Sequence, residues 1–334
     1  MINKKIVGLI IGLVICALIP LLVKSPYYID LIIMTMVNAA LAMMFIMGLR
    51  AGLINMGIVS FWGVGTYASA ILSTKLHMNV WLSMPTAALV TGVIAFIFGV
   101  VLLRKNTSGF GFVMLSIIIG MLFSVVVGSI SYLGAWNGIS NIPPPSPIKI
   151  PFLPPIEFIS KIEFFYLGMF IFLIIVLISY AFYAAWTGRA WIAIGLGPRL
   201  AESIGINLFR YRLLAFVLSS TLCGLIGAFY AHYQAYVVPD TFGMWQNIYV
   251  QIYAILGGVS FAFLGPVVGA VVMTFFPEYI RMTSVVAPVF TGILLILLIL
   301  FLPGGLLGLG KYWPIFAKVV SKKFSLLVRK ARQS

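Results

Sequence analysis

Charge is scarce in this chain, and acidic charge is the scarcest. Only 8% of its 334 residues are charged, and just six of them are acidic, against 21 basic residues. A soluble domain carries about 25% charged residues, so a single soluble globular domain is excluded. The chain is 63% hydrophobic, with a mean hydropathy of +1.17 and long apolar runs that lack the alternation of barrel strands. The sequence therefore predicts an all-α polytopic membrane protein.

The residues that catalysis, metal binding and ion coupling need are also few. Cys16 and Cys223 share no motif, and the two histidines have no metal-ligand spacing. No carboxylate pair lies on one predicted span, which argues against an ion-coupled transporter. The phosphate-binding pattern GxxxxGK[ST] is missing. We therefore expect no enzyme, no cofactor and no metal: the chain is a passive pore, or partners supply its energy.

Basic residues orient the predicted spans. With the N-terminus inside, 16 of the 21 basic residues fall in cytoplasmic segments, so the positive-inside rule places both termini in the cytoplasm. The same distribution argues against nucleic acid as a partner. We expect eight to ten transmembrane helices, drawn from residues 6–23, 29–48, 53–73, 82–103, 110–130, 164–186, 212–235, 246–259, 264–280 and 286–302.

The predicted organisation is a transmembrane domain at 1–310 and a basic amphipathic cytoplasmic tail at 311–334, which is expected to lie on membrane lipid. An external loop at 131–163 is rich in proline and is expected to be extended. It is a cap over the outer mouth or a docking surface for an external binding protein. The polar, arginine-bearing segment at 187–212 interrupts the apolar runs, and we interpret it as a docking element that faces the cytosol.

Two glycine-rich segments echo each other at a constant offset. Gly57, Val59, Ser60, Phe61 and Gly65 recur as Gly257, Val259, Ser260, Phe261 and Gly265. The pattern is a chance match or a true internal repeat. In transporters, repeated glycine-broken helices meet near the membrane midplane and line the substrate route. The stretch 246–280 is therefore two short spans or one re-entrant element.

Six segments spread over most of the chain together resemble one family. They are GLINMGIVSFWGVGTYASA (52–70), NGISNIPPPSP (137–147), AESIGINLFRYRLLAFVLSSTLCGLIGAFYAHY (201–233), VVPDTF (237–242), ILGGVSFAFLGPVVGA (255–270) and LFLPGGLLG (300–308). On these motifs the chain resembles the permease subunits of branched-chain amino acid ABC importers, specifically the M-type partner of the two-permease system. The resemblance implies a second homologous permease, two cytosolic ABC ATPases and an extracytoplasmic substrate-binding protein, in a bacterial or archaeal plasma (inner) membrane.

In that family a cytosolic loop docks in the ATPase as a short coupling helix, which maps here to about Ala193–Asn207. The family's acidic position falls on Glu202, and Gly205 matches the turn that ends the helix. The charged run that usually precedes this position is missing, and Pro198 suits the first turn of a shorter helix. The residues that the resemblance implies for ATPase coupling are Pro198, Arg199, Glu202, Ser203, Gly205 and Asn207.

The resemblance also implies alternating access, with a translocation path between the two permeases. The residues implied to line it are Asn55, Ser60, Phe61, Thr66, Tyr67, Tyr253 and Ser260. Such a weakly polar lining suits leucine, isoleucine or valine, although ordinary helix packing explains the same small residues. The alternatives are an ABC permease for urea or another small amide or amino acid, an ATP-independent channel or facilitator and, more distantly, a membrane enzyme.

Overall fold

The computed structural model describes residues 25–103, 109–148, 157–281 and 304–308, together with Pro20 and Gly292. This part of the chain is helical and contains no β-strand, and an isolated bridge joins Ile139 to Val237. By length and composition, five of its helices can cross a membrane. They are α2 (Pro26–Arg50), α4 (Val80–Leu103), α5 (Gly109–Ser129), α6 (Lys161–Ala184) and α9 (Leu208–Gln234). The predicted all-α polytopic membrane fold is confirmed.

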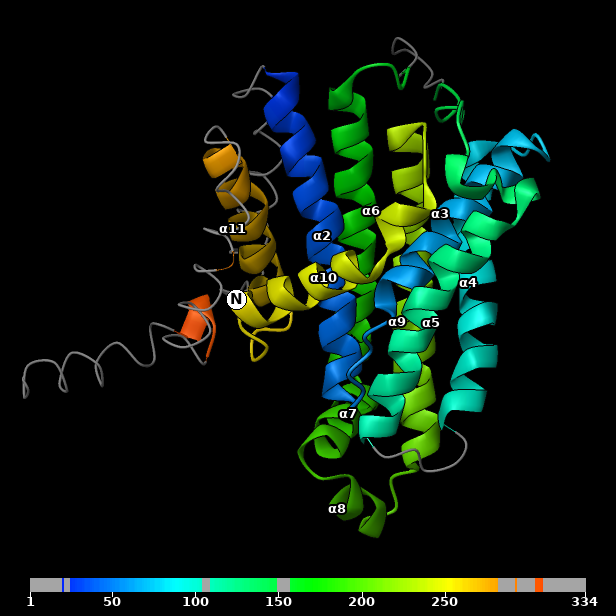
Figure 1. Cartoon of the computed structure of the whole chain (residues 1–334). Coiled ribbons are helices and arrows are strands. Elements are labelled where there is room, and N and C mark those ends of the chain that lie inside the picture. The colour runs from blue at the N-terminus through cyan, green and yellow to red at the C-terminus, as the bar shows by residue number, and fades with distance from the viewer. Residues whose placement is uncertain are drawn as a thin grey trace, which may run out of the picture.

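Shorter elements complete the described part. They are α3 (Ile58–Thr74), α7 (Trp186–Leu196), α8 (Pro198–Ser203), α10 (Met244–Gly257), α11 (Leu264–Arg281) and the 3-10 turns η1 (Ser131–Leu133), η2 (Ala135–Asn137), η3 (Pro239–Phe242) and η4 (Leu306–Gly308). Figure 1 shows α10 lying across the bundle, whereas α2, α4, α6 and α9 run along it. Apart from the isolated Pro20 and Gly292, the predicted spans at 6–23 and 286–302 and the tail at 311–334 lie outside the described residues. The number of spans therefore stays a prediction.

The long helices differ in how far the rest of the chain surrounds them. In the most apolar 18-residue window of each, 72% of α2 and 67% of α9 is buried, against 39%, 28% and 39% for α4, α5 and α6. Glycines let α3 cross α9 closely, since a Cβ on Gly65 would lie 2.2 Å from the carbonyl oxygen of Gly224. The centre of the bundle is therefore α2 and α9, and the outer helices turn large apolar side chains outward.

Two short non-helical segments interrupt the helices. The first break, residues 51–57, separates α2 from α3, and the second break, residues 258–263, separates α10 from α11. Each contains a glycine with positive φ, +73° at Gly52 and +111° at Gly258, where a side chain would strain the backbone. The predicted glycine-broken helices are thus present.

The two echoed segments adopt different local structures. In the first copy Gly57 is the N-cap of α3 and the following residues are helical, whereas in the second copy Gly257 ends α10 and the chain enters a break. The predicted span at 53–73 is consequently helical only from Ile58. The predicted span at 246–259 is α10, a helix of 14 residues. The same residue pattern therefore spans the start of α3 in the first copy and the end of α10 in the second.

Helix caps make two predicted loops shorter. α6 begins inside the predicted external loop at 131–163, because Ser160 and Glu163 form a capping box. α9 begins inside the predicted coupling loop at 187–212, because the Asn207 side chain caps it. The rest of that second loop is itself helical, over α7 and α8.

These two segments lie at opposite ends of the bundle, because α6 runs from one to the other (Figure 1). We call them the loop end and the arm end. At the loop end the proline-rich segment is held against α9, where His232 Nδ1 donates to the carbonyl oxygen of Pro143 at 2.7 Å. Nε2 of the same ring lies 2.8 Å from Ser69 Oγ on α3. The loop end is thus tied to two inner helices through one buried histidine.

Candidate functional site: the arm, the breaks and a polar set between helices

The arm made of α7 and α8 projects from one end of the bundle (Figure 1). Its base is anchored by Trp191, which is fully buried and donates its indole N–H to the carbonyl oxygen of Tyr211 at 2.9 Å. The Trp191 ring stacks on Phe182, with 6.3 Å between centroids. A Cβ on Gly195 would lie 2.5 Å from the Arg50 carbonyl oxygen, so α7 also packs closely on the end of α2. The base of the arm is therefore fixed to the bundle.

The tip of the arm is α8, whose ends are defined by two residues. Pro198 stands in the first turn, as the sequence predicted, where its missing N–H leaves no hydrogen bond unmade. At the other end, the amides of Gly205 and Ile206 donate, at 3.0 Å each, to carbonyl groups of the last turn. These are the hydrogen bonds of a Schellman motif, and Gly205 has the positive φ, +87°, that the motif requires. The helix is thus shorter than the expected Ala193–Asn207.

All six residues implied for ATPase coupling are exposed on this tip: Pro198, Arg199, Glu202, Ser203, Gly205 and Asn207. Three large apolar side chains lie among them at four-residue intervals. Leu196 is 86% exposed, Leu200 75% and Ile204 73%. Exposed large apolar side chains on a projecting segment are typical of a surface that contacts another molecule. The structure therefore brings the predicted residues together, and we call these nine residues the tip surface.

Two arginines connect the base of the arm to both breaks. Arg212 Nε donates to the carbonyl oxygen of Ala51, in the first break, at 3.4 Å. Arg50 Nη2 donates to the carbonyl oxygen of Ser260, in the second break, at 3.0 Å. The Arg50 guanidinium carbon also lies 5.0 Å from the centroid of the Tyr183 ring. The sequence predicted neither hydrogen bond, and together the two bonds tie the arm ends of α9 and α2 to the two breaks.

The first break is closed by side chains. Three of them accept hydrogen bonds from backbone N–H groups around the start of α3: Asn55 of the break itself at 3.0 Å, Ser116 of α5 at 3.0 Å and Asn247 of α10 at 2.9 Å. These bonds satisfy backbone groups that water cannot reach inside the bundle. The N-terminus of α3 is therefore occupied by the protein's own side chains rather than open to an anion.

The residues implied to line the translocation path come from α3, α10 and the two breaks. Asn55, Ser60, Phe61, Thr66, Tyr67 and Tyr253 are buried, and Ser260 is exposed. The Thr66 hydroxyl is used internally, donating to the Trp62 carbonyl oxygen at 2.8 Å. Within the described residues, the Asn55 amide nitrogen and the Tyr67 hydroxyl have no hydrogen-bond partner. Contact of these residues with a solute stays a prediction.

A polar set that sequence reasoning missed joins α2, α10 and α11. Gln246 Nε2 donates to Asn38 Oδ1 at 3.4 Å, and Asn38 Nδ2 donates to Thr274 Oγ1 at 3.5 Å. We call these three residues the midspan set. Asn38 is the central residue of the 25-residue helix α2. The signal available in the sequence was an asparagine in the middle of an apolar run.

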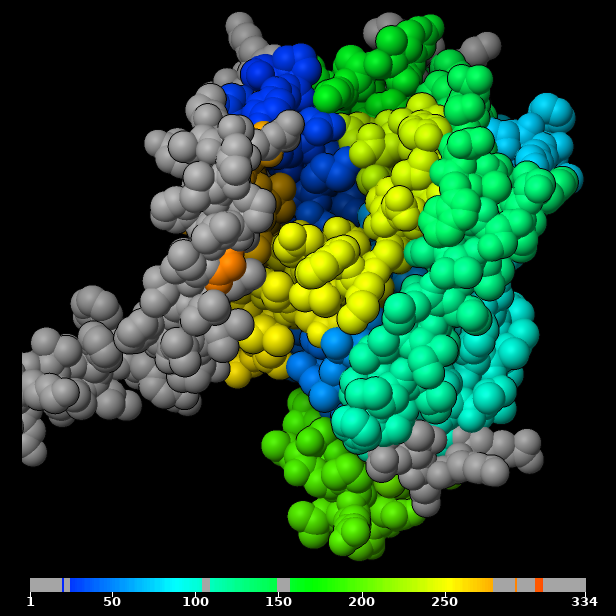
Figure 2. Space-filling view, viewed as in Figure 1, coloured from blue at the N-terminus to red at the C-terminus, as the bar shows by residue number. Residues whose placement is uncertain are grey.

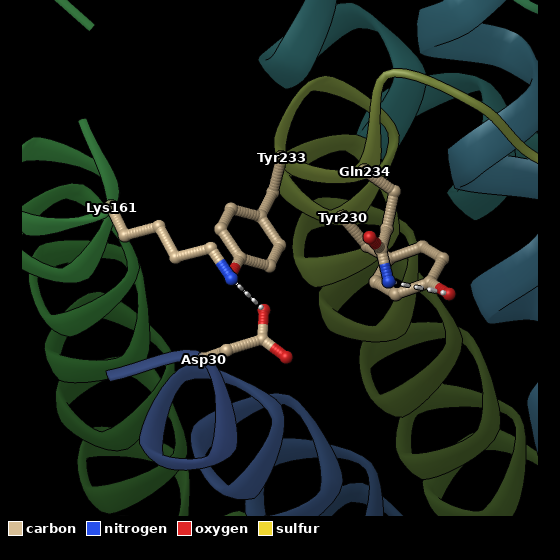
Figure 3. A network of polar contacts seen from close by, with 5 residues as sticks. All are labelled: Asp30, Lys161, Tyr230, Tyr233 and Gln234. Carbon is tan, nitrogen blue, oxygen red and sulfur yellow. Dashed lines mark hydrogen bonds and ion pairs between the residues drawn. The ribbon is translucent and has the colours of Figure 1, made fainter. Parts of the chain in front are cut away.

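At the loop end, Asp30 joins three helices (Figure 3). Lys161 Nζ of α6 lies 3.2 Å from the Asp30 carboxylate of α2, and Tyr233 of α9 donates its hydroxyl to the same carboxylate. The two charged side chains are 43% and 37% exposed, so the ion pair contributes about 0–1 kcal/mol. This network holds the loop ends of α2, α6 and α9 together.

Comparison with known proteins identifies the family. The family described as "Branched-chain amino acid transport system / permease component" matches residues 25–302. The chain belongs to this family. It is therefore a multi-pass transport permease, in a family of transport subunits rather than enzymes.

Individual relatives share a low sequence identity with this permease but align with more than half of its length. The high-affinity branched-chain amino acid transport system permease protein LivM of Salmonella typhimurium is 26% identical over 305 residues, 84% of this chain and 69% of that protein. LivM of Escherichia coli is 24% identical over 281 residues, 77% of this chain and 64% of that protein. The nucleoside ABC transporter permease protein NupC of Lactococcus lactis is 28% identical over 200 residues, 54% and 59% of the two chains. The comparison with solved structures gave no significant match.

Proposed function

We propose that this permease is a membrane subunit of an ABC importer for branched-chain amino acids, driven by partner ATPases. The observation that carries the proposal is the tip surface, where the six exposed residues implied for coupling and three exposed apolar side chains stand on an arm with a fixed base. Such a surface suits docking to a second protein, because contact residues gain most when large apolar groups are removed from water. A channel that works without protein partners would not require an exposed docking surface of this kind.

The proposed assembly contains a second homologous permease, two cytosolic ABC ATPases and an extracytoplasmic substrate-binding protein. The arm end would face the cytosol, since Arg50, Arg199 and Arg212 all lie there and basic residues favour that side. The loop end would then face the binding protein. In this proposal both termini lie in the cytoplasm, and the protein lies in a bacterial or archaeal plasma (inner) membrane.

Transport would proceed by alternating access. Closure of the ATPases would move the tip surface, and the fixed base of the arm would carry that motion to the end of α2. Because Arg50 bonds the second break, the motion would shift this break relative to the first one. The path residues proposed above lie around these two breaks: Asn55, Ser60, Phe61, Thr66, Tyr67, Tyr253 and Ser260.

Branched-chain amino acids are the proposed substrates because the family and the LivM proteins carry that description. A nucleoside is the second candidate, because NupC is described as a nucleoside permease and is 28% identical over 200 residues. Urea or another small amide or amino acid is a further alternative. Uptake of radiolabelled leucine, adenosine and urea by cells with and without this gene separates them, and leucine is the substrate that we expect.

The assembly is tested by purifying the tagged chain from its native host in mild detergent and identifying what accompanies it by mass spectrometry. We expect an ATPase with a phosphate-binding motif and a second, similar permease. The double variant Arg199→Glu, Glu202→Lys should lose the ATPase and keep the second permease. A matched charge reversal at the loop end, Lys75→Glu with Glu157→Lys, should keep both. Recovery of the chain only with copies of itself would contradict the proposal and favour a channel.

A further inference from the structure

The midspan set lies where three helices meet halfway along the bundle. Asn38 is the central residue of α2, Gln246 lies near the start of α10, and Thr274 lies in the middle of α11. All three side chains are partly buried. Viewed as in Figure 1, the space-filling view in Figure 2 shows a hollow with α2 in dark blue at its back and α10 in yellow along its lower edge. Polar side chains at this depth carry a cost in lipid, so their presence calls for a solute or a bonded partner.

The mutual hydrogen bonds of the set leave much of its capacity unused. Their lengths of 3.4 and 3.5 Å are longer than the ordinary range for N–H···O bonds. Within the described residues, the side-chain oxygen of Gln246 accepts no hydrogen bond and the Thr274 hydroxyl donates none. Each amide nitrogen also carries a second hydrogen. The set therefore offers both donors and an acceptor at one place.

A small zwitterion requires both kinds of group. Its carboxylate can accept from the Asn38 amide and the Thr274 hydroxyl, while its ammonium group can donate to the Gln246 oxygen. The set contains no ionised side chain, so these contacts are weak enough to release a solute after it enters. Tyr249 follows Gln246 by three residues on α10, so it shares that face of the helix, and it is 40% exposed. Its ring provides an apolar surface for an aliphatic side chain.

We propose that Asn38, Gln246 and Thr274 form a substrate-contact site that receives the ammonium and carboxylate groups of an amino acid in passage. This inference rests on the proposed import of amino acids. It places the contact on α2, α10 and α11, whereas six of the seven path residues implied by resemblance are buried.

The first test is water accessibility, which does not depend on the identity of the substrate. Asn38→Cys and Thr274→Cys are made in a chain without native cysteines (Cys16→Ser, Cys223→Ser), and the assembled complex is treated with a charged methanethiosulfonate. Two controls bracket the result. Ser179→Cys is fully buried in α6, and Val93→Cys is 60% exposed on the outer face of α4, where lipid rather than water is expected. We expect both midspan cysteines to react at least about tenfold faster than either control, as water-exposed thiols do relative to buried ones.

Leucine then separates a path from a substrate contact. In complexes that import leucine, excess leucine should slow the labelling of Asn38→Cys and Thr274→Cys severalfold. Labelling no faster than the controls, or labelling that leucine leaves unchanged, would overturn the inference. If the wild-type complex imports no leucine, the proposed substrate is wrong, and the labelling rate still shows whether the set faces an aqueous path.

A second measurement uses a substitution that preserves shape. Thr274→Val removes the hydroxyl and keeps the volume, so the KM for leucine uptake should rise about fivefold, the effect of one lost hydrogen bond, with the amount of assembled complex unchanged. Thr86→Val on α4 is the matched control and should leave KM as it is. If Thr274→Val reduces the amount of complex and leaves KM unchanged, the set only packs the helices and the inference is wrong.

Discussion

The two breaks in the helices are closed by different means. Around the first break, the buried side chains of Asn55, Ser116 and Asn247 accept hydrogen bonds from backbone N–H groups, and Arg212 donates to the carbonyl oxygen of Ala51. The second break is held by close backbone packing between glycines and by one arginine, Arg50, which bonds the exposed Ser260. A bond that water cannot replace is costly to open, whereas a bond at the surface exchanges readily with water. The first break is therefore a fixed point, and the second is the one that can move with the arm.

The largest loss of stability is expected from a substitution that opens the first break. Gly57→Ala places a Cβ 2.3 Å from the Ser116 carbonyl oxygen, so α5 and the first break must separate. We expect a loss of about 3 kcal/mol in the free energy of unfolding, measured as a lower midpoint of thermal unfolding in detergent. Gly109→Ala, where a Cβ meets nothing within 4 Å, is the matched control on α5. Equal midpoints for the two variants would show that the first break is looser than its contacts indicate.

The next largest loss of stability is expected when one hydrogen-bond acceptor is removed from the same break. Asn247→Ala leaves the Val59 N–H without its acceptor in a buried position, at a cost of about 1–3 kcal/mol. The exposed Asn137→Ala should leave the thermal midpoint unchanged. If Asn247→Ala is also silent, a water or another group satisfies this amide, and the contrast between the breaks weakens.

Arg50→Ala tests the movable break and should act on coupling more than on stability. It removes the bond to Ser260, and because this contact is exposed we expect a loss of only about 1 kcal/mol in the free energy of unfolding. In the proposed importer, ATP hydrolysis should continue while the amount of leucine imported per ATP falls severalfold. Arg210→Ala, also exposed at the arm end, is the control. A large loss of stability with normal coupling in the surviving complex would assign Arg50 to the fixed part.

The smallest effect is at the tip of the arm. Gly205→Ala forces a side chain into positive φ with open space around it, so the cost is about 1 kcal/mol and purely conformational. Faster hydrogen exchange in α8, with the breaks unchanged, is the expected result. Gly197→Ala should show little change, because its φ of −170° suits any residue. If exchange also rises in the second break, the arm and the break move as one unit.

Sequence reasoning reached the helical fold, the breaks and the start of α8, because each depends on local chemistry. Apolar runs, glycines and a proline at the first turn act over a few residues, so their effect can be read without neighbours. The family resemblance supplied six of the nine residues of the tip surface, and the structure added the exposed side chains of Leu196, Leu200 and Ile204. All nine residues fall within residues 196–207, so their proximity follows from the short segment that contains them.

The contacts that organise the rest connect distant parts of the chain. Asn247 caps α3 by accepting a hydrogen bond from Val59, which lies 188 residues earlier in the chain. Arg50 bonds Ser260, which lies 210 residues later. Nothing local in either sequence segment specifies such a partner. The same limit explains why the two echoed segments differ: Gly57 meets α5, whereas Gly257 packs against Gly265 and Gly269. Burial of the implied path residues is likewise a property of the assembled bundle.

The length of α10 has a consequence for how this protein is made. With 14 residues the helix is about 21 Å long, shorter than the ~30 Å hydrocarbon core. It carries Gln246, Asn247 and Gln251, so it has little tendency to leave the translocon for lipid by itself. During synthesis we therefore expect it to insert together with α11, into a membrane where α2 already offers Asn38 as a hydrogen-bond partner and α2 and α5 offer surfaces to pack against. Insertion of the last described helices is thus a late step of assembly that depends on the helices made before them.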